Sequence, residues 1–143
     1  MDIHKINIPP PASPAAPKRI LVIEDDTALA NLYQTTLEKG GYQITLAFDG
    51  ESGFKEMRSG GYSLVLLDLV LPKKNGLDIL KELQTHPPQK PNETVIILSN
   101  LQENINIAEG AALGVKGYMI KSDYTPGQIL EKVRYYLGEN PET

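Results

Sequence analysis

Carboxylates, a hydroxyl and an amine follow four short apolar segments of this chain, each at the point where the segment ends. These residues are Glu24, Asp25, Asp68, Ser99 and Lys121. The segments are a strand's length and rich in Leu, Ile and Val, which is typical of strands buried on both faces of a sheet. Because the carboxyl ends of parallel strands open onto one edge of a sheet, these side chains are expected to meet in one crevice.

Three carboxylates in one crevice repel one another, and a divalent cation would neutralise them. Oxygen ligands without His or Cys favour Mg²⁺ or Mn²⁺ over zinc. A carboxylate between such a cation and the Lys121 ammonium could accept a phosphoryl group, and the Ser99 hydroxyl would hydrogen-bond one of its oxygens. Taken singly, Asp68 could simply cap a turn, and Lys121 could be a surface lysine. Matching groups at all four strand ends favour the chemical interpretation.

The elements that must position these groups alternate along the chain. The predicted strands are residues 20–23, 42–47, the apolar run that ends at Asp68, 94–98 and 117–120. A helix is predicted after each strand, over about 26–39, 51–59, 76–85, 102–113 and 125–137. Five β–α units predict a parallel sheet with helices on both faces and right-handed crossovers. In the fourth helix, the predicted inward stripe is Ile105, Ala108 and Ala112.

Length and composition fit one domain with short appendages. The chain has 143 residues, a net charge of −4 and no cysteine. Residues 1–17, with five prolines among Ala and Ser, predict a flexible tail. Residues 18–138 form the predicted domain, and 139–143 a short C-terminal tail. The acidic charge argues against direct nucleic-acid binding, and the lack of a long apolar run argues against a membrane span. A cytoplasmic location is therefore expected.

Four motifs in this order and spacing resemble the receiver domain of two-component response regulators. They are Ile20–Asp26, Leu67–Pro72 with Gly76, Val95–Ser99 and Gly117–Lys121. The resemblance covers about residues 18–138. It implies a flavodoxin-like (βα)5 three-layer α/β sandwich with a five-stranded parallel sheet in the order 2-1-3-4-5. It also implies a signalling domain, not an ordinary enzyme, that takes part in its own phosphorylation and dephosphorylation.

The resemblance assigns a role to each residue at the strand ends. Asp68 would accept a phosphoryl group from the phosphohistidine of a histidine kinase or phosphotransfer protein, assisted by Lys121 and Ser99. Mg²⁺ (or Mn²⁺) would be held by an acidic pocket in which Glu24 acts through water. The implied metal ligands are Glu24, Asp25, Asp68 and the backbone carbonyl of Val70.

The resemblance further implies a switch that links the site to a partner surface. Ser99 would move toward the phosphoryl group and Tyr118 would follow, remodelling the face made by the fourth helix, fifth strand and fifth helix. Exposed Ile107, Ala111 and Tyr135 would present this face to an output partner that the sequence does not name. A homodimer through the same face is a further expectation, although residues 115–117 lack the acidic side chains that some family dimers use.

The sequence departs from the family pattern at four positions near the site. Ser122 replaces the usual proline after the lysine, which puts the family's cis peptide bond in question because a non-proline cis bond costs about 3 kcal/mol. Asn100 replaces a small residue and would narrow access or hydrogen-bond the phosphoryl group. Val70 and Leu101 are apolar where other members often place polar side chains that handle the attacking water. Phosphorylated Asp68 is therefore expected to hydrolyse slowly.

Three other functions fit the sequence less well than the receiver. An aspartyl-phosphate phosphatase of the haloacid dehalogenase type needs a second Asp two residues after the nucleophile, where this chain has Val70. A phosphorylation-independent pseudo-receiver usually lacks the key Asp or Lys, and both are present here. A Rossmann-type nucleotide binder is disfavoured because the first strand leads into acids, not a glycine-rich loop. Only six residues follow Leu137, so the sequence predicts a stand-alone, CheY-like receiver.

Overall fold

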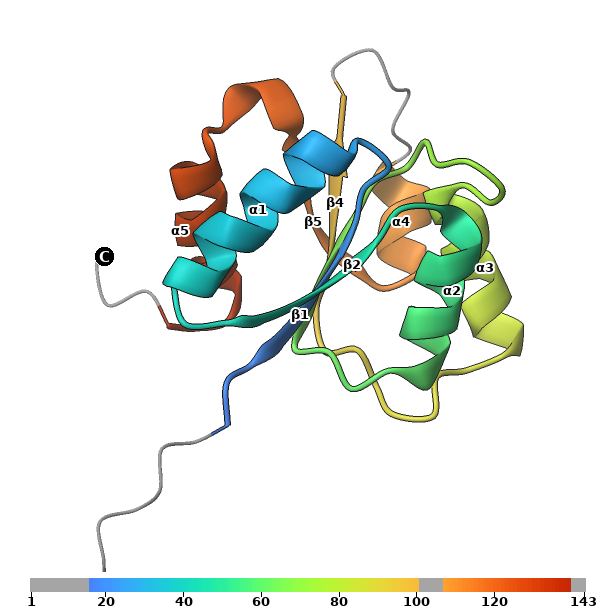
Figure 1. The fold of residues 1–143 in the computed structure, drawn as a ribbon. Helices are drawn as coiled ribbons and strands as arrows, with labels where there is room; N and C mark the ends of the chain where they lie inside the picture. The colour runs from blue at the N-terminus through green and yellow to red at the C-terminus, as the bar shows by residue number, and fades with distance from the viewer. Residues whose placement is uncertain (1–15, 101–106, 140–143) are drawn as a thin grey trace, which may run out of the picture.

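A single five-stranded parallel sheet forms the centre of the molecule (Figure 1). The computed structural model describes residues 16–100 and 107–139. The strand order is β2-β1-β3-β4-β5, the flavodoxin-like order expected from the sequence. The strands are β1 (Arg19–Ile23), β2 (Gln43–Ala47), β3 (Leu64–Leu67), β4 (Val95–Ser99) and β5 (Val115–Ile120).

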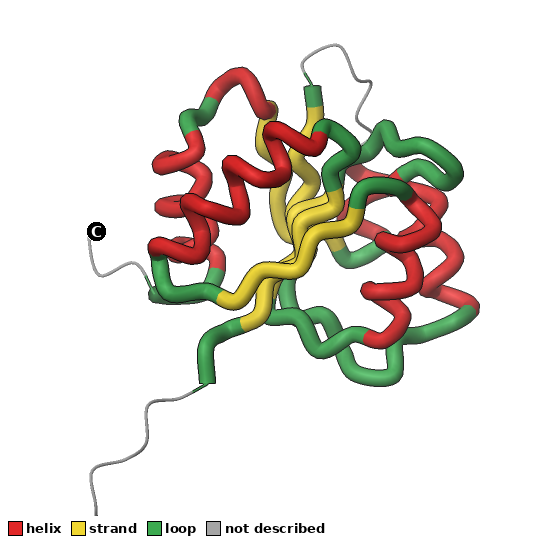
Figure 2. The backbone as a smooth tube through the Cα atoms, viewed as in Figure 1, coloured by secondary structure: helices red, strands yellow, loops and turns green. Residues whose placement is uncertain are grey.

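Helices cover both faces of the sheet (Figure 2). One face carries α1 and α5, and the other carries α2, α3 and α4 (Figure 1). A short 3-10 turn, η2, links β5 to α5. The helices are α1 (Thr27–Lys39), α2 (Gly50–Ser59), α3 (Gly76–Thr85), α4 (Ile107–Ala112) and α5 (Pro126–Tyr136), with η2 at Lys121–Asp123. The three-layer sandwich predicted from the sequence is thus confirmed.

The alternating side chains of β1 show how the two cores are built. Leu21 and Ile23 join the cluster beneath α2 and α3, whereas Ile20 and Val22 join the cluster beneath α1 and α5. All four are at most 1% exposed, so both faces of this strand are buried. Burial of each such side chain contributes about 1.5–3 kcal/mol. The strand is therefore fixed on both sides, and the residue that follows it emerges at a defined place.

Side-chain caps mark the starts of four helices. Asp26 accepts a hydrogen bond from the Leu29 N–H at the start of α1, at 3.1 Å. Asp49, Asn75 and Thr125 cap α2, α3 and α5 in the same way. Each cap satisfies a backbone N–H that the helix itself leaves unpaired. These caps fix where the connections after β1, β2, β3 and β5 end.

The fourth helix differs from the prediction. Its described part is Ile107–Ala112, while residues 101–106, including Ile105, lie outside the described residues. The predicted inward stripe is wrong at Ala108 and Ala112, which are exposed, and Gly110 is buried instead. The helix turns its glycine inward because the ring of Tyr118 occupies the space beside it.

The two ends of the described chain meet at the amino edge of the sheet. The Lys18 ammonium lies 2.6 Å from Glu139, and the Tyr42 hydroxyl donates a 2.5 Å hydrogen bond to the same carboxylate. The Lys18 and Tyr42 hydrogen bonds lower the pKa of Glu139. Burial, reinforced by the neighbouring Glu139 carboxylate, raises the pKa of Tyr42 to about 12. Within the described residues, no helix is both long and apolar enough to cross a bilayer.

Candidate functional site

Four strands deliver polar groups to one edge of the sheet. Glu24 follows β1, Asp68 follows β3, Ser99 ends β4 and Lys121 follows β5. The Glu24 N–H donates to the Ala47 carbonyl and the Asp68 N–H to the Ile23 carbonyl, both at 3.0 Å. These bonds continue the strand pairing beyond the apolar segments. As a result, polar side chains are held in a nearly solvent-free place, with Glu24 2%, Asp68 3% and Ser99 0% exposed.

Lys121 bridges the two buried carboxylates. Its Nζ lies 2.6 Å from Oε1 of Glu24 and 2.9 Å from Oδ2 of Asp68. Burial alone would lower the pKa of Lys121, but its hydrogen bonds and attraction to Glu24 and Asp68 outweigh burial and raise it. The lysine therefore stays charged and places a fixed positive charge beside the Asp68 carboxylate.

The Glu24 carboxylate is held in its buried position at a cost. Burial raises its pKa, while hydrogen bonds from the Lys121 ammonium and the Asp26 N–H oppose that rise. The Asp26 N–H donates to Oε2 of Glu24 at 3.1 Å. The hydrogen bonds to Glu24 thus only partly offset the cost of burying its negative charge.

Three carboxylates form a cluster suited to a divalent cation. One carboxylate oxygen each from Glu24, Asp25 and Asp68 lies within 4.8 Å of the others, and Asp25 is the exposed member. With Lys121 as the neighbouring cation, three carboxylates and one ammonium leave a formal charge of −2. An all-oxygen, negatively charged site with one open side fits a hard ion such as Mg²⁺. The acidic residues predicted from the sequence are brought together.

The loop after β3 orients Asp68. The Val70 N–H donates to Oδ1 of Asp68 at 3.2 Å, so each oxygen of this carboxylate has a partner. The Val70 side chain is 61% exposed, whereas Leu69 and Leu71 on either side are buried. The buried leucines fix the loop and leave the position two residues after Asp68 facing solvent.

Ser99 and Tyr118 lie on neighbouring strands beyond the acidic cluster. Within the part of the chain that the structure describes, the Ser99 hydroxyl is fully buried and has no hydrogen-bond partner. An unpaired buried hydroxyl costs about 1–3 kcal/mol, so this group is available to a ligand oxygen. Tyr118 packs against the core, and its hydroxyl donates to the Ile107 carbonyl at 3.1 Å.

Gly110 is a residue of this region that the sequence interpretation missed. A Cβ added there would lie 1.6 Å from the Tyr118 hydroxyl oxygen. Only glycine therefore lets the Tyr118 ring reach the Ile107 carbonyl beneath α4. A glycine in the middle of a predicted helix is a signal for close packing of this kind.

Of the four sequence departures, Val70 is described above, two more can be located and one cannot. The peptide bond between Lys121 and Ser122 is trans, and the described residues contain no cis peptide bond. Asn100 is exposed directly after β4. Leu101 lies outside the described residues.

A doubly wound α/β sheet with an acid cluster and a lysine at its carboxyl edge defines the class of protein. A family model described as the response regulator receiver domain matches residues 20–134. The chain belongs to this family.

Relatives and solved structures agree with this assignment. The transcriptional regulatory protein DltR of Streptococcus agalactiae is 34% identical over 116 residues, which are 81% of this chain and 50% of DltR. The alkaline phosphatase synthesis regulator PhoP of Bacillus subtilis is 32% identical, over 84% of this chain and 48% of PhoP. This chain thus spans about half the length of the curated relatives it matches.

Two solved receiver structures are similar in both fold and sequence. The Francisella response regulator 1452 receiver domain has a TM-score of 0.71 and 28% identity, over 85% of this chain and 97% of that one. Thermotoga maritima TrrA, solved in complex with Mg²⁺ and BeF, has a TM-score of 0.68 and 29% identity, over 83% and 98%.

Proposed function

We propose that this receiver domain accepts a phosphoryl group on Asp68 from the phosphohistidine of a histidine kinase or phosphotransfer protein. The observation that carries the proposal is the placement of Asp68 between the Lys121 ammonium and the Glu24–Asp25 acids, at 3% exposure. In the transfer, the bond from phosphorus to the histidine nitrogen breaks and a bond from phosphorus to an Asp68 oxygen forms. The electron pair of the broken bond stays on the imidazole.

The surrounding residues suit each part of this transfer. Lys121, whose pKa is raised, keeps a positive charge next to the oxygens on which negative charge is concentrated. The unpaired Ser99 hydroxyl can donate to a phosphoryl oxygen. Glu24, Asp25, Asp68 and the Val70 carbonyl would hold Mg²⁺ or Mn²⁺, which when bound neutralises phosphoryl charge.

Replacing Asp68 by asparagine is expected to abolish phosphorylation, because an amide oxygen is a poor nucleophile and an acyl phosphate cannot form. The measurement is the mass gain of the intact protein after incubation with Mg²⁺ and acetyl phosphate. Asp123→Asn, at the end of the 3-10 turn η2 that leads to α5, is the matched control and should still gain one phosphoryl group. No mass gain in the wild type would support a pseudo-receiver, and a gain in Asp68→Asn would place the modification elsewhere.

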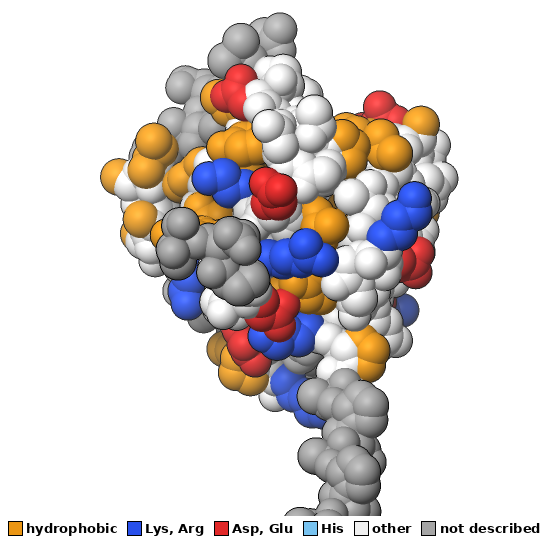
Figure 3. All heavy atoms as spheres, turned by 90° about the vertical axis from the view of Figure 1, so that its left-hand side faces the viewer, with side chains coloured by type: hydrophobic (Ala, Val, Ile, Leu, Met, Phe, Trp, Pro, Cys, Tyr) orange, Lys and Arg blue, Asp and Glu red, His pale blue; other side chains and the backbone are white. Residues whose placement is uncertain are grey.

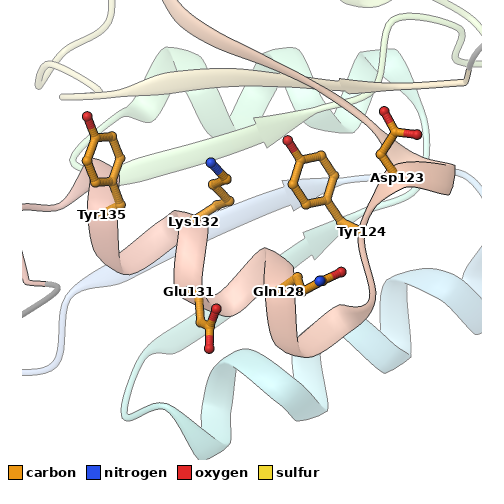
Figure 4. Close-up of a pocket in the computed structure, with 6 residues that line it drawn as sticks. All are labelled: Asp123, Tyr124, Gln128, Glu131, Lys132 and Tyr135. Atoms are coloured by element: carbon orange, nitrogen blue, oxygen red, sulfur yellow. The ribbon is translucent and has the colours of Figure 1, made fainter. Parts of the chain in front are cut away.

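The output surface in this proposal is the face of α4, β5 and α5. Ile107 is 64% and Tyr135 65% exposed, and Figure 3 shows hydrophobic and charged side chains interspersed on the side of the molecule that includes α5. A shallow hollow of about 290 Å³ lies along α5 (Figure 4). It is lined by Asp123, Tyr124, Gln128, Glu131, Lys132 and Tyr135.

This face suits a protein partner with mixed polar and apolar groups. Two tyrosines border the hollow, and the Lys132 Nζ lies 6.0 Å from the centre of the Tyr124 ring.

Because the named relatives are transcriptional regulators, the partner proposed here is a transcriptional output protein or module; self-association through the same face is a second outcome. Beryllofluoride with Mg²⁺ should shift the amide signals of Ile107, Tyr118 and Tyr135 in the wild type; unchanged signals would argue against this output face.

The phosphorylated state is expected to be long-lived, because neither Val70 nor Leu101 can position the attacking water. Replacing Val70 by asparagine supplies a polar group on the exposed side of the loop and should speed loss of the phosphate about tenfold. The measurement is the decay of the phosphorylated mass after the donor is removed. Val70→Thr keeps the shape with a weaker polar group and should decay at an intermediate rate. Equally rapid decay in the wild type and in Val70→Asn would contradict this expectation.

A further inference from the structure

The first turn of α2 sits directly on the backbone of the loop that follows Asp68. The Gly50 N–H donates to the Pro72 carbonyl at 2.9 Å. A Cβ added at Gly50 would lie 1.7 Å from the Lys74 carbonyl oxygen and 2.4 Å from its carbonyl carbon. Contacts this close to backbone atoms cannot be relieved by a side-chain rotation. Glycine is therefore required for α2 to approach the loop.

Two lysines of the same loop hold its flanks. Lys73 has a left-handed backbone, with φ of 71°, and its Nζ lies 3.5 Å from Asp49 and 3.9 Å from Glu51 at the start of α2. Lys74 pairs with Glu82 of α3, and its Nζ lies 4.6 Å from the centre of the Phe54 ring. The loop is thus fastened to α2 on one side and to α3 on the other.

The fastened segment is the one that orients the Asp68 carboxylate. Val70, whose N–H donates to Oδ1 of Asp68, lies two residues before Pro72. On the other side, the Gly76 N–H donates to the Leu69 carbonyl at 2.8 Å. Val70 is therefore held between two backbone anchors, one at Leu69 and one at Pro72.

We infer that Gly50 and Lys74 are positioning residues for the Asp68 site, acting through the loop that carries Val70. They hold the Val70 peptide in the orientation that aims its N–H at Asp68, and so fix the direction of the carboxylate. The inference deepens the proposed function and rests on it for the link to cation binding. The placement of the Val70 N–H itself is independent of that function.

Removing Lys74 distinguishes a role in positioning the loop from a purely electrostatic effect on the acid cluster. If the lysine acted only as a nearby positive charge, its removal would make the acid cluster bind a divalent cation more tightly. If it fastens the loop, its removal would disorder a group beside the metal site and weaken binding. Loss of a group that orients a metal ligand typically costs about 10-fold or more in metal affinity.

The test uses two readouts on the full chain, with Mn²⁺ as the probe. Free Mn²⁺ is measured by electron paramagnetic resonance to give the Mn²⁺ Kd, and the exchange rate of the Val70 amide proton is measured by NMR without metal. Lys74→Ala is expected to weaken Mn²⁺ binding about 10-fold and to speed Val70 amide exchange severalfold. Gly50→Ala should change both readouts in the same direction and by more.

Two controls match these substitutions. Lys81→Ala removes a lysine of α3 whose ion pair, at 2.8 Å, is with Glu109 of α4 and not with a residue of the loop. Gly127→Ala adds a methyl group in the first turn of α5, where the nearest described atom outside the helix backbone is the Thr125 hydroxyl, 3.9 Å away. Both should keep the wild-type Val70 exchange rate and Mn²⁺ Kd.

The outcomes separate the inference from the proposed function. Tighter or unchanged Mn²⁺ binding with unchanged Val70 exchange in Lys74→Ala would overturn the inference, and this variant decides alone if Gly50→Ala does not fold. If the wild type binds no Mn²⁺ at the site, the proposed function fails, and the Val70 exchange rates still decide whether the loop is fastened as inferred.

Discussion

Replacing Lys121 by methionine is expected to lower the free energy of unfolding of the metal-free protein by about 3 kcal/mol near neutral pH. The lysine is the shared partner of Glu24 and Asp68, both nearly fully buried. Methionine fills most of the volume but leaves two carboxylates without a counter-charge. Urea unfolding followed by circular dichroism measures the loss. Phosphorylation from acetyl phosphate should fall about 100-fold in the same variant, because a fixed charge next to the reacting oxygens is gone.

The lost stability should return as the pH is lowered. Burial already raises the pKa of Glu24 above its ordinary value of 4.5, and removal of the ammonium raises it further. A carboxyl group whose folded pKa is raised binds a proton in the folded state before the unfolded state does. The free energy of unfolding of Lys121→Met should therefore increase as the pH falls through the folded pKa of Glu24 toward 4.5. Mn²⁺ should stabilise the variant more than the wild type.

The matched control is Lys116→Met, which removes the same charge from an exposed position of β5. It should leave both stability and phosphorylation near wild-type values, since isolated surface charges contribute little. A Lys121→Met protein as stable as the wild type at neutral pH, with no gain at lower pH, would contradict the central placement of this lysine.

Replacing Gly110 by alanine is expected to drive Tyr118 out of its place beneath α4. The new methyl group would lie 1.6 Å from the tyrosine oxygen and 2.8 Å from the ring carbon that bears it. The ring can swing away, but the Ile107 carbonyl then loses its donor and the core loses part of an aromatic contact. We expect a net cost of about 1–3 kcal/mol in the free energy of unfolding, although alanine alone would favour the helix.

The position of Tyr118 can be followed directly through its titration. Burial, and then the nearby Glu109 carboxylate, raise the pKa of Tyr118. In Gly110→Ala this pKa should fall toward the ordinary value of 10, as measured from the ring carbon signal of labelled tyrosine. The amide response of α4 to beryllofluoride should shrink as well, because the ring no longer contacts the helix. Gly127→Ala is again the control.

A double substitution decides whether the effect acts through Tyr118. Gly110→Ala combined with Tyr118→Ala removes the ring that the methyl group would strike. The two changes should therefore be strongly non-additive, with Gly110→Ala costing nothing in the Tyr118→Ala background. Additive costs would show that Gly110 matters for another reason.

The placement of the site residues could be predicted from the sequence because it depends on where strands end. One apolar run stops at Asp68 and another stops at Lys121. Once the strands are parallel, these end points determine which side chains reach the carboxyl edge of the sheet. The structure brings Glu24, Asp25, Asp68 and Lys121 together as expected. The roles in phosphorylation and metal binding remain predictions.

The parts that escaped prediction depend on close approaches between distant segments. Gly110 beneath Tyr118, and Gly50 against Lys74, act through the absence of a side chain, which a periodicity pattern does not register. The prediction of the inward face of α4 was wrong for the same reason, because Ala and Gly give only a weak hydrophobic periodicity. The contact of Glu139 with Lys18 joins residues near opposite ends of the described chain, and nothing local marks either of them as a partner of the other.

That contact also sets the distance between anything attached to the two ends of the domain. Lys18 immediately precedes β1 and Glu139 follows α5, yet their side chains lie 2.6 Å apart. Two modules fused at these positions through short flexible linkers would encounter each other at an effective concentration in the millimolar range. Even a pair with weak mutual affinity would then associate on this scaffold, so the domain offers a compact platform for joining two binding activities in one chain.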